Sequence, residues 1–341
     1  MAEDVPVAGP ARPAGSPAGS PLGSPIGGAG IGGLVGRVTG LAGSRSVRWG
    51  FGLVALALAV WAIAGRREAV LSALHRLDLR YLALAALATL VNEAFTGLAW
   101  RALLTDLGSR LPVAAAVRVF FVGQIGKYLP GSLWPLVVQA ELARDHGVPR
   151  RRAAAASLVM ILLSAASGLL VVLLCLPFVP SVAHSGYGWA LVLVVPLLVL
   201  LHPAVIGRVL DRLLRVVGGE PLEQRPSLRG TAVATGWAAG SWVTAGLQVW
   251  LLALPLGLAA SPHTLALAFG GYGLAWAVGL VVVIAPAGAG AREVALAAVL
   301  ASSLDAGAVV VVVLLSRVLF STADLALAGV GLAIGRAEKR A

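Results

Sequence analysis

GQIGKYLPGSLWP at residues 123–135 and IAPAGAGAREVA at residues 284–295 interrupt two long apolar stretches of the chain. Apolar sequence resumes after each interruption, and the two breaks begin 161 residues apart (284 minus 123). Interrupted membrane segments in corresponding places of two halves are typical of transporters, whose binding sites lie at such breaks. The pair therefore predicts a polytopic membrane protein with a transport site.

Composition supports a membrane protein. Hydrophobic residues make up 59% of the 341 residues and charged residues only 12%, and several apolar runs reach the roughly 20 residues that cross a bilayer. The net charge of +11 raises the possibility of a nucleic-acid partner. However, the arginines fall mostly in short loops between spans, where the positive-inside bias and anionic headgroups account for them. We expect anionic lipids at these loops and no nucleic acid.

The sequence gives little indication of catalysis or metal binding. Cys175 is the single cysteine, so no intramolecular disulfide can form, and the five histidines lack metal-ligand spacing. There is no nucleophile-elbow or P-loop motif in a suitable setting and no loop long enough for a soluble catalytic domain. We expect no cofactor, no metal and no enzymatic activity.

The predicted architecture is an all-α polytopic membrane protein with about six full spans and two re-entrant helical hairpins. A Gly-, Pro-, Ala- and Ser-rich segment at 1–44 is expected to be a disordered tail, followed by a membrane domain at 45–336 and a basic tail at 337–341. The apolar segments are 49–64, 81–104, 112–126, 134–146, 153–178, 187–206, 231–258, 264–285, 291–304 and 306–335.

Charge asymmetry predicts the orientation. Arginines are concentrated in the loop 207–229, before the span at 153 and in the C-terminal tail, whereas 179–188 and 259–263 contain no Lys or Arg. The segments 112–146 and 264–304 then each enter and return on one side, giving an inverted repeat of about 49–178 and 187–335 in a plasma-membrane protein with cytoplasmic termini. The four arginines in 65–80 oppose this orientation, because that loop would lie outside.

The first break combines helix-stopping residues with a cation. Gly126, Pro130 and Gly131 end helix propagation there and leave backbone groups unpaired. Lys127, Tyr128 and Trp134 lie beside them, and a lysine near unpaired amides suits an anion such as a phosphate headgroup. The alternative is an interfacial turn in which the lysine snorkels and the aromatic residues lie in the aromatic belt.

The second break repeats this combination. Pro286, Gly288 and Gly290 interrupt the helix, and Arg292 and Glu293 follow at the start of the next. The arginine could bind phosphate with two parallel hydrogen bonds, and the glutamate could pair with a cationic group or with Arg292. The alternative is a glycine-rich packed bend with an internal ion pair.

Further ionisable residues lie within the apolar segments. Glu93 and Arg101 share one helix face, and because a charge at the bilayer centre is costly, Glu93 is expected to face a cavity or a buried partner. Glu141 on the return arm of the first hairpin could line the same cavity or form an interfacial salt bridge. Arg317 and Asp324, seven residues apart, could line the cavity or pair between helices.

KYLPGSLW at 127–134 and PAGAGAREVAL at 286–296 resemble the lysylphosphatidylglycerol synthase transmembrane family, the flippase-like domain of the multiple peptide resistance factor. The resemblance covers about residues 50–335. It implies a lipid flippase fold, with the matching positions being Lys127, Tyr128, Pro130, Gly131, Trp134, Pro286, Gly288, Gly290, Arg292 and Glu293. Relatives that synthesise the aminoacylated lipid carry a soluble aminoacyl-transferase domain that this sequence lacks, so its substrate need not be an aminoacylated lipid.

The sequence therefore predicts a flippase for a lipid with a charged headgroup, with a cavity near the midplane formed by the two hairpins. Lys127 and Arg292 would hold phosphate, and Glu93, Glu141 or Glu293 would balance cationic groups. Two alternatives remain open. One is an ion-coupled secondary transporter of a small solute that uses Glu93 or Asp324, and the other is a non-catalytic membrane subunit of a lipid-modifying enzyme.

Overall fold

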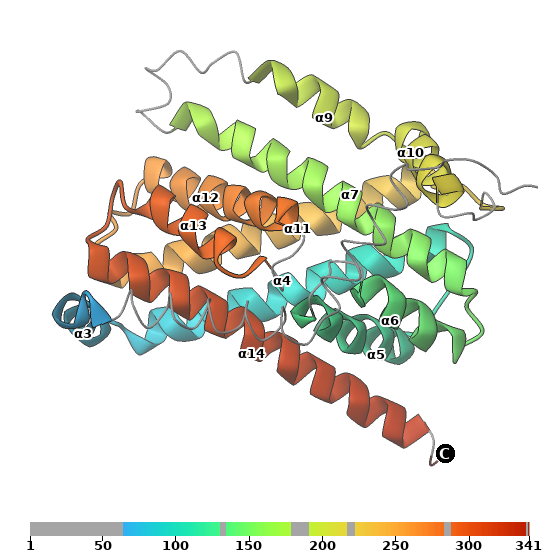
Figure 1. The fold of residues 1–341 in the computed structure, drawn as a ribbon, viewed down its shortest axis with the longest axis horizontal. Helices are drawn as coiled ribbons and strands as arrows, with labels where there is room; N and C mark the ends of the chain where they lie inside the picture. Colours follow the sequence, from blue (N-terminus) through green and yellow to red (C-terminus); the bar gives the residue numbers. More distant parts are fainter. Residues whose placement is uncertain are drawn as a thin grey trace, which may run out of the picture.

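The computed structural model describes residues 64–129, 134–178, 191–216, 222–282, 288–338 and 340, with the side chain at 214 excepted. Every regular element in these ranges is a helix, and the helices form an elongated bundle (Figure 1). In chain order they are α3 (Arg67–His75), α4 (Leu79–Asp106), α5 (Val113–Gln124), η1 (Ile125–Tyr128), α6 (Trp134–Arg144), α7 (Arg150–Cys175), η2 (Leu176–Phe178), α9 (Val194–Leu200), α10 (Pro203–Val216), α11 (Leu228–Ala253), η4 (Leu254–Leu256), α12 (Pro262–Val281), α13 (Ala291–Leu300) and α14 (Ala306–Glu338).

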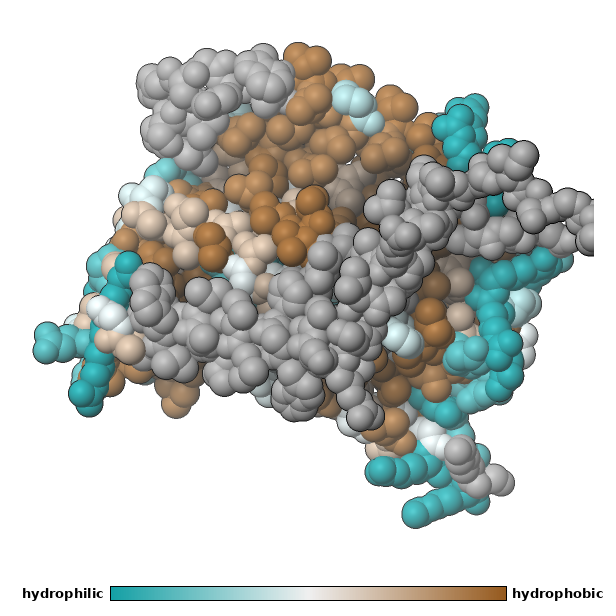
Figure 2. Space-filling view, in the orientation of Figure 1, coloured by the Kyte–Doolittle hydropathy of each residue, from teal (hydrophilic) through white to brown (hydrophobic). Residues whose placement is uncertain are grey.

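The long helices are apolar around most of their circumference, as expected where the solvent is lipid. Within the described residues, five helices are long and apolar enough to cross a membrane, and the bent pair of α9 and α10 would make a sixth if it is one span. Large apolar side chains such as Leu87, Val243 and Leu325 are 57%, 55% and 63% exposed on the outside of the bundle. Among the coloured residues in Figure 2, hydrophobic ones gather between the two ends of the molecule and hydrophilic ones lie mainly at those ends. The polytopic all-α membrane fold predicted from the sequence is confirmed.

Polar caps fix where several of these helices begin. The Asp78 carboxylate accepts a hydrogen bond from the Arg80 amide at 2.8 Å at the start of α4. The Ser261 hydroxyl and Thr264 form a reciprocal capping box at the start of α12. Because the first amides of a helix have no partner within the helix, these side chains complete their hydrogen bonding and hold the helix ends in place.

Two apolar cores lie at opposite ends of the bundle, and α4 and α11 contribute to both. One core joins α4, α5, α6, the first part of α7, α10 and the start of α11; the other joins α3, the first part of α4, the rest of α11, α12, α13 and α14. The indole of Trp100 donates to the Ser157 hydroxyl, and that of Trp242 donates to the Ser167 hydroxyl, both at 3.0 Å. These buried bonds hold α7 against α4 and α11. Of all described helix pairs, α4 and α11 pack together most extensively.

At each break of the sequence, two neighbouring helices pack side by side: α5 with α6, and α12 with α13. Gly126 lets the first pair approach, because a Cβ there would lie 2.8 Å from the Pro135 nitrogen. Gly288 has φ of +68° and would place a Cβ 2.8 Å from the Gly279 Cα, and Gly290 has φ of +87° where α13 begins. At 20 residues, α12 is itself long enough to cross a bilayer, whereas α5, α6 and α13 have 12, 11 and 10 residues.

Two stretches expected as loops are helical. Residues 67–75 form α3, and the expected loop at 207–229 begins with ten residues of α10. The sequence analysis missed α10 because the helix is amphipathic: its arginines lower the average hydropathy of the segment, although one face is apolar. Ile206 and Leu210, four residues apart on that face, are buried. The tail 1–44, most of the first expected span, Pro130, Gly131, Pro286 and the expected outer turn 179–188 lie outside the described residues.

Candidate functional site

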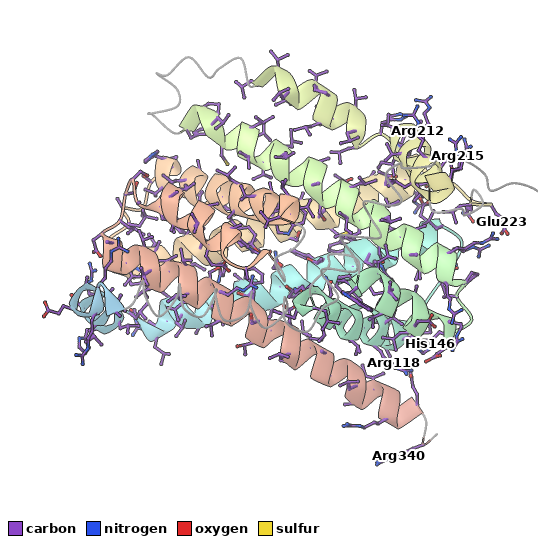
Figure 3. The ribbon with its side chains drawn as sticks, viewed as in Figure 1. Arg118, His146, Arg212, Arg215, Glu223 and Arg340 are labelled. Atoms are coloured by element: carbon purple, nitrogen blue, oxygen red, sulfur yellow. The ribbon has the colours of Figure 1, made fainter. Side chains whose placement is uncertain are left out.

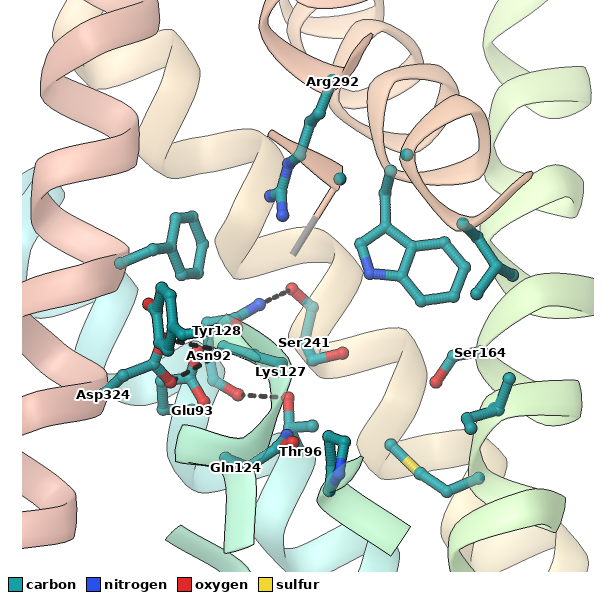
Figure 4. Close-up of a pocket in the computed structure, with 18 of the residues that line it drawn as sticks. Asn92, Glu93, Thr96, Gln124, Lys127, Tyr128, Ser164, Ser241, Arg292 and Asp324 are labelled. Carbon is teal, nitrogen blue, oxygen red and sulfur yellow. Dashed lines mark hydrogen bonds and ion pairs between the residues drawn. The ribbon is translucent and has the colours of Figure 1, made fainter. Parts of the chain in front are cut away.

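A cavity of about 510 Å³ lies between the two apolar cores, within the usual range for small-molecule sites. Side chains from α4, α5, η1, α6, α7, α10, α11, α12, α13 and α14 line it, so both sequence breaks contribute to one cavity. One part of its wall carries charged residues from α4, η1, α13 and α14, and another part, formed by α7 and α10, is mainly apolar, with Ser157 and Ser164 among its residues. Figure 4 shows the charged groups converging on the cavity from different helices.

Lys127, Tyr128 and Asp324 form a buried network on the cavity wall. The lysine Nζ lies 2.8 Å from each carboxylate oxygen of Asp324, and the Tyr128 hydroxyl donates to Asp324 Oδ2 at 2.6 Å. The Asp324 side chain is fully buried, whereas that of Lys127 is 28% exposed. Asp324, for which the sequence left cavity lining and interhelical pairing open, therefore does both. It ties α14 to the first break.

Arg292 occupies the opposite side of the charged wall and points toward the cavity (Figure 4). Its guanidinium carbon lies 4.6 Å from the centre of the Tyr272 ring and 5.6 Å from that of Phe320. Cation–π contacts hold the guanidinium plane without using up its outward N–H donors. In the part of the chain that the structure describes, Arg292 has no ion pair with a carboxylate.

Glu293 also lines the cavity, but its carboxylate is used in other contacts. Oε2 accepts a hydrogen bond from the Gly290 amide at 2.6 Å and so caps α13. Oε1 lies 3.5 Å from the Arg317 Nε. Of the two pairings that the sequence left open for Glu293, the one with Arg292 is not found among the described residues, because residue 293 faces α14 while Arg292 stacks on the aromatic rings. Glu293 thus fixes the start of the helix that presents Arg292.

Glu93 is the cavity carboxylate without such a partner. It is 4% exposed and lines the cavity from α4, close enough to Lys127, Asp324 and Arg292 for their charges to act on it. No hydrogen bond or ion pair joins its carboxylate to another described residue. Arg101, which the sequence places on the same helix face as Glu93, does not line the cavity. Its Nε donates to the Leu111 carbonyl oxygen at 3.1 Å.

Two of the expected site residues are not brought to the cavity. Glu141 forms an ion pair with Arg150 at 2.7 Å, and both side chains are about half exposed. The reason lies in helix geometry: Gln139 of α6 lines the cavity, and residue 141 is rotated by about 200° from it. Trp134, at the first position of α6, is 44% exposed and is not part of the cavity wall.

The sequence analysis did not identify the aromatic residues that line the cavity. Tyr272 and Phe320 stack with Arg292, and Trp242 and Trp276 form an edge-to-face pair, 5.4 Å between ring centres, on the same wall. Aromatic residues in apolar helices are ordinary core residues. Only the way in which α11, α12 and α14 meet at the cavity distinguishes these residues, and no local spacing in the sequence predicts it.

The apolar helices of the bundle, with a charged cavity between them, define an integral, multi-pass membrane protein. Residues 47–327 match the model of the family described as lysylphosphatidylglycerol synthase TM region. The chain belongs to this family, which confirms the resemblance found in the two broken segments. No curated protein matches the chain.

Proposed function

We propose that this protein moves a lipid with a charged headgroup from one leaflet to the other through the cavity. The observation that carries the proposal is the charged cavity between helices whose outer surfaces are apolar. A charged headgroup could occupy the cavity while its acyl chains stay in the bilayer. The tails would not cross water, so the main cost is headgroup desolvation, which fixed charges can offset.

The contacts within the cavity suggest a role for each charged residue. Arg292 would bind the phosphate, because its stacked guanidinium is oriented in advance and planar donors suit two-point phosphate binding. Glu93 would face a cationic group on the same headgroup. Lys127, already shared with Asp324, would be a second phosphate contact that becomes accessible only when that ion pair loosens.

The proposal includes a membrane arrangement. The two broken segments would be opposed re-entrant hairpins of an inverted repeat that meet near the midplane, in a plasma-membrane protein with cytoplasmic termini. The chain performs no catalytic step in this scheme. A separate lipid-modifying enzyme would be the partner wherever the headgroup is an altered one.

Leaflet exchange in proteoliposomes tests the proposal. Fluorescent phosphatidylglycerol and phosphatidylethanolamine are placed in both leaflets, and a membrane-impermeant reductant reports the fraction that reaches the outside. We expect Arg292→Gln to slow exchange about 10- to 100-fold, the equivalent of one charge-assisted hydrogen bond of roughly 1.5–3 kcal/mol. The matched control is Arg336→Gln on the exposed end of α14, which should exchange lipid as the wild type does. Equal rates for wild type and Arg292→Gln would contradict the proposal.

An ion-coupled transporter of a small solute is the second candidate, and the unpartnered Glu93 carboxylate is the observation in its favour. Membrane carboxylates of this kind carry protons in many transporters. Uptake of a solute driven by an imposed pH gradient, and lost in Glu93→Gln, would support this candidate over lipid exchange.

A further inference from the structure

Helix α10 has the form of a helix that lies at the membrane surface. It meets α9 at an angle of 70°, and the two helices lie at the edge of the bundle beside α7 (Figure 1). Ile206 and Leu210 are each 1% exposed, whereas Arg208, Arg212 and Arg215 are exposed on the remaining surface. One buried apolar face and one basic face are typical of interfacial helices.

Acidic side chains of the described residues do not cancel the positive charge of α10. Asp211, the acidic residue of α10, forms its ion pair with Arg225 at 3.2 Å. Within the described ranges, Arg208, Arg212 and Arg215 have no ion pair, and the Arg215 Nε donates only to the Asp211 backbone oxygen at 3.1 Å. Figure 3 shows Arg212 and Arg215 projecting away from the bundle. The surface therefore attracts anions.

Leu213 connects this surface with the cavity. It lines the cavity together with Leu158, Ile161 and Leu162 of α7, so the apolar part of the wall reaches α10. The neighbouring helix α9 exposes apolar side chains such as Val195, which is 63% exposed. A molecule that contacts the arginines and this apolar surface together must have an anionic head and a hydrocarbon body.

We propose that α10 is a basic lip that concentrates anionic phospholipid beside the apolar part of the cavity. The occupant is a phospholipid of net negative charge from the adjacent leaflet. The basic face attracts its headgroup, and Leu213 with the α7 leucines offers its acyl chains a path along the cavity wall. Delivery of this lipid for transport rests on the proposed function, whereas binding at α10 does not.

Native mass spectrometry of the purified full chain in mixed micelles tests the lip, with phosphatidylglycerol competing against phosphatidylcholine. Each arginine near an anionic lipid surface favours binding by a factor of about five, so the triple variant Arg208→Gln/Arg212→Gln/Arg215→Gln should lose the preference for phosphatidylglycerol by at least about tenfold. The matched control, Arg66→Gln/Arg67→Gln/Arg80→Gln, removes three exposed arginines at the other end of the bundle and should keep it.

The proposal would be wrong if the α10 variant kept the preference for phosphatidylglycerol, or if the control variant lost it to the same extent. Both variants alter only exposed side chains, and circular dichroism confirms that each is folded. If the wild-type protein exchanges no lipid between leaflets but the α10 variant still loses its preference for phosphatidylglycerol, the transport proposal is wrong and the proposed lipid binding at α10 is supported.

Discussion

Replacing Lys127 with methionine should destabilise the fold strongly, and a second replacement at Asp324 should recover much of the loss. The Asp324 carboxylate is fully buried, and within the described residues its hydrogen bonds come from Lys127 and Tyr128. Without the lysine it becomes a buried charge with one neutral donor, which costs about 3–5 kcal/mol. Lys127→Met/Asp324→Leu removes both charges, and such paired replacements are often close to neutral.

A double-mutant cycle measures this coupling. The free energy of unfolding is determined by denaturant titration in mixed micelles for the wild type, Lys127→Met, Asp324→Leu and the double variant. Because loss of the lysine alone costs about 3–5 kcal/mol and the double variant is expected to be close to neutral, the coupling energy should be at least about 3 kcal/mol, at the top of the range for contacting residues. The matched control is the Glu141–Arg150 pair, whose N–O distance is also near 2.7 Å but whose side chains are half exposed. Its coupling should stay below about 1 kcal/mol. Equal coupling in the two cycles would refute the reasoning.

Three further predictions concern other parts of the structure. Gly288→Ala should lower the melting temperature, because it combines a φ of +68° with a close backbone contact and costs about 1–3 kcal/mol; Gly236→Ala, in a helix with open space at the Cβ, should be neutral or stabilising. Tyr272→Leu should weaken lipid exchange about two- to thirtyfold, since it removes the closer cation–π contact of Arg292, worth roughly 0.5–2 kcal/mol, and Phe at the same position should preserve exchange. At the start of α14, outside the spans, the Ala308 amide and then the Arg76 guanidinium lower the pKa of Asp305. Its stabilising effect is therefore present above the ordinary carboxyl pKa near 4 and is lost as the pH falls through the lowered value. Asp305→Asn should remove that part of the acid sensitivity of the melting temperature.

Local sequence predicted most of the fold because apolar helices in lipid are recognised by length and hydropathy alone. The segments predicted at 81–104 and 306–335 correspond to α4 and α14 within a few residues. Sequence reasoning failed at α10, where hydropathy averages over an amphipathic helix and hides it. It also failed at α3, which is short and depends on packing against α14.

The candidate site could be predicted in part. Lys127, Arg292 and Glu93 were identifiable because charge at membrane depth is costly and glycine and proline mark the breaks. Their partners could not be predicted, since Asp324 lies 197 residues from Lys127 in sequence and helix rotation decides which face each residue presents. The same rotation directs Glu141 outward and Glu293 toward Arg317.

Photo-crosslinking from inside the cavity tests the central claim most directly. A photoreactive benzophenone residue replaces Phe320, which lines the cavity beside Arg292, and a second protein carries it at Val318, which is 56% exposed on the same helix. After illumination in membranes, tandem mass spectrometry identifies the lipid bound to each. The account predicts phospholipid adducts at both positions, with those at 320 lost on Arg292→Gln and those at 318 retained. Adducts at 318 with none at 320, or adducts at 320 that persist in Arg292→Gln, would contradict it.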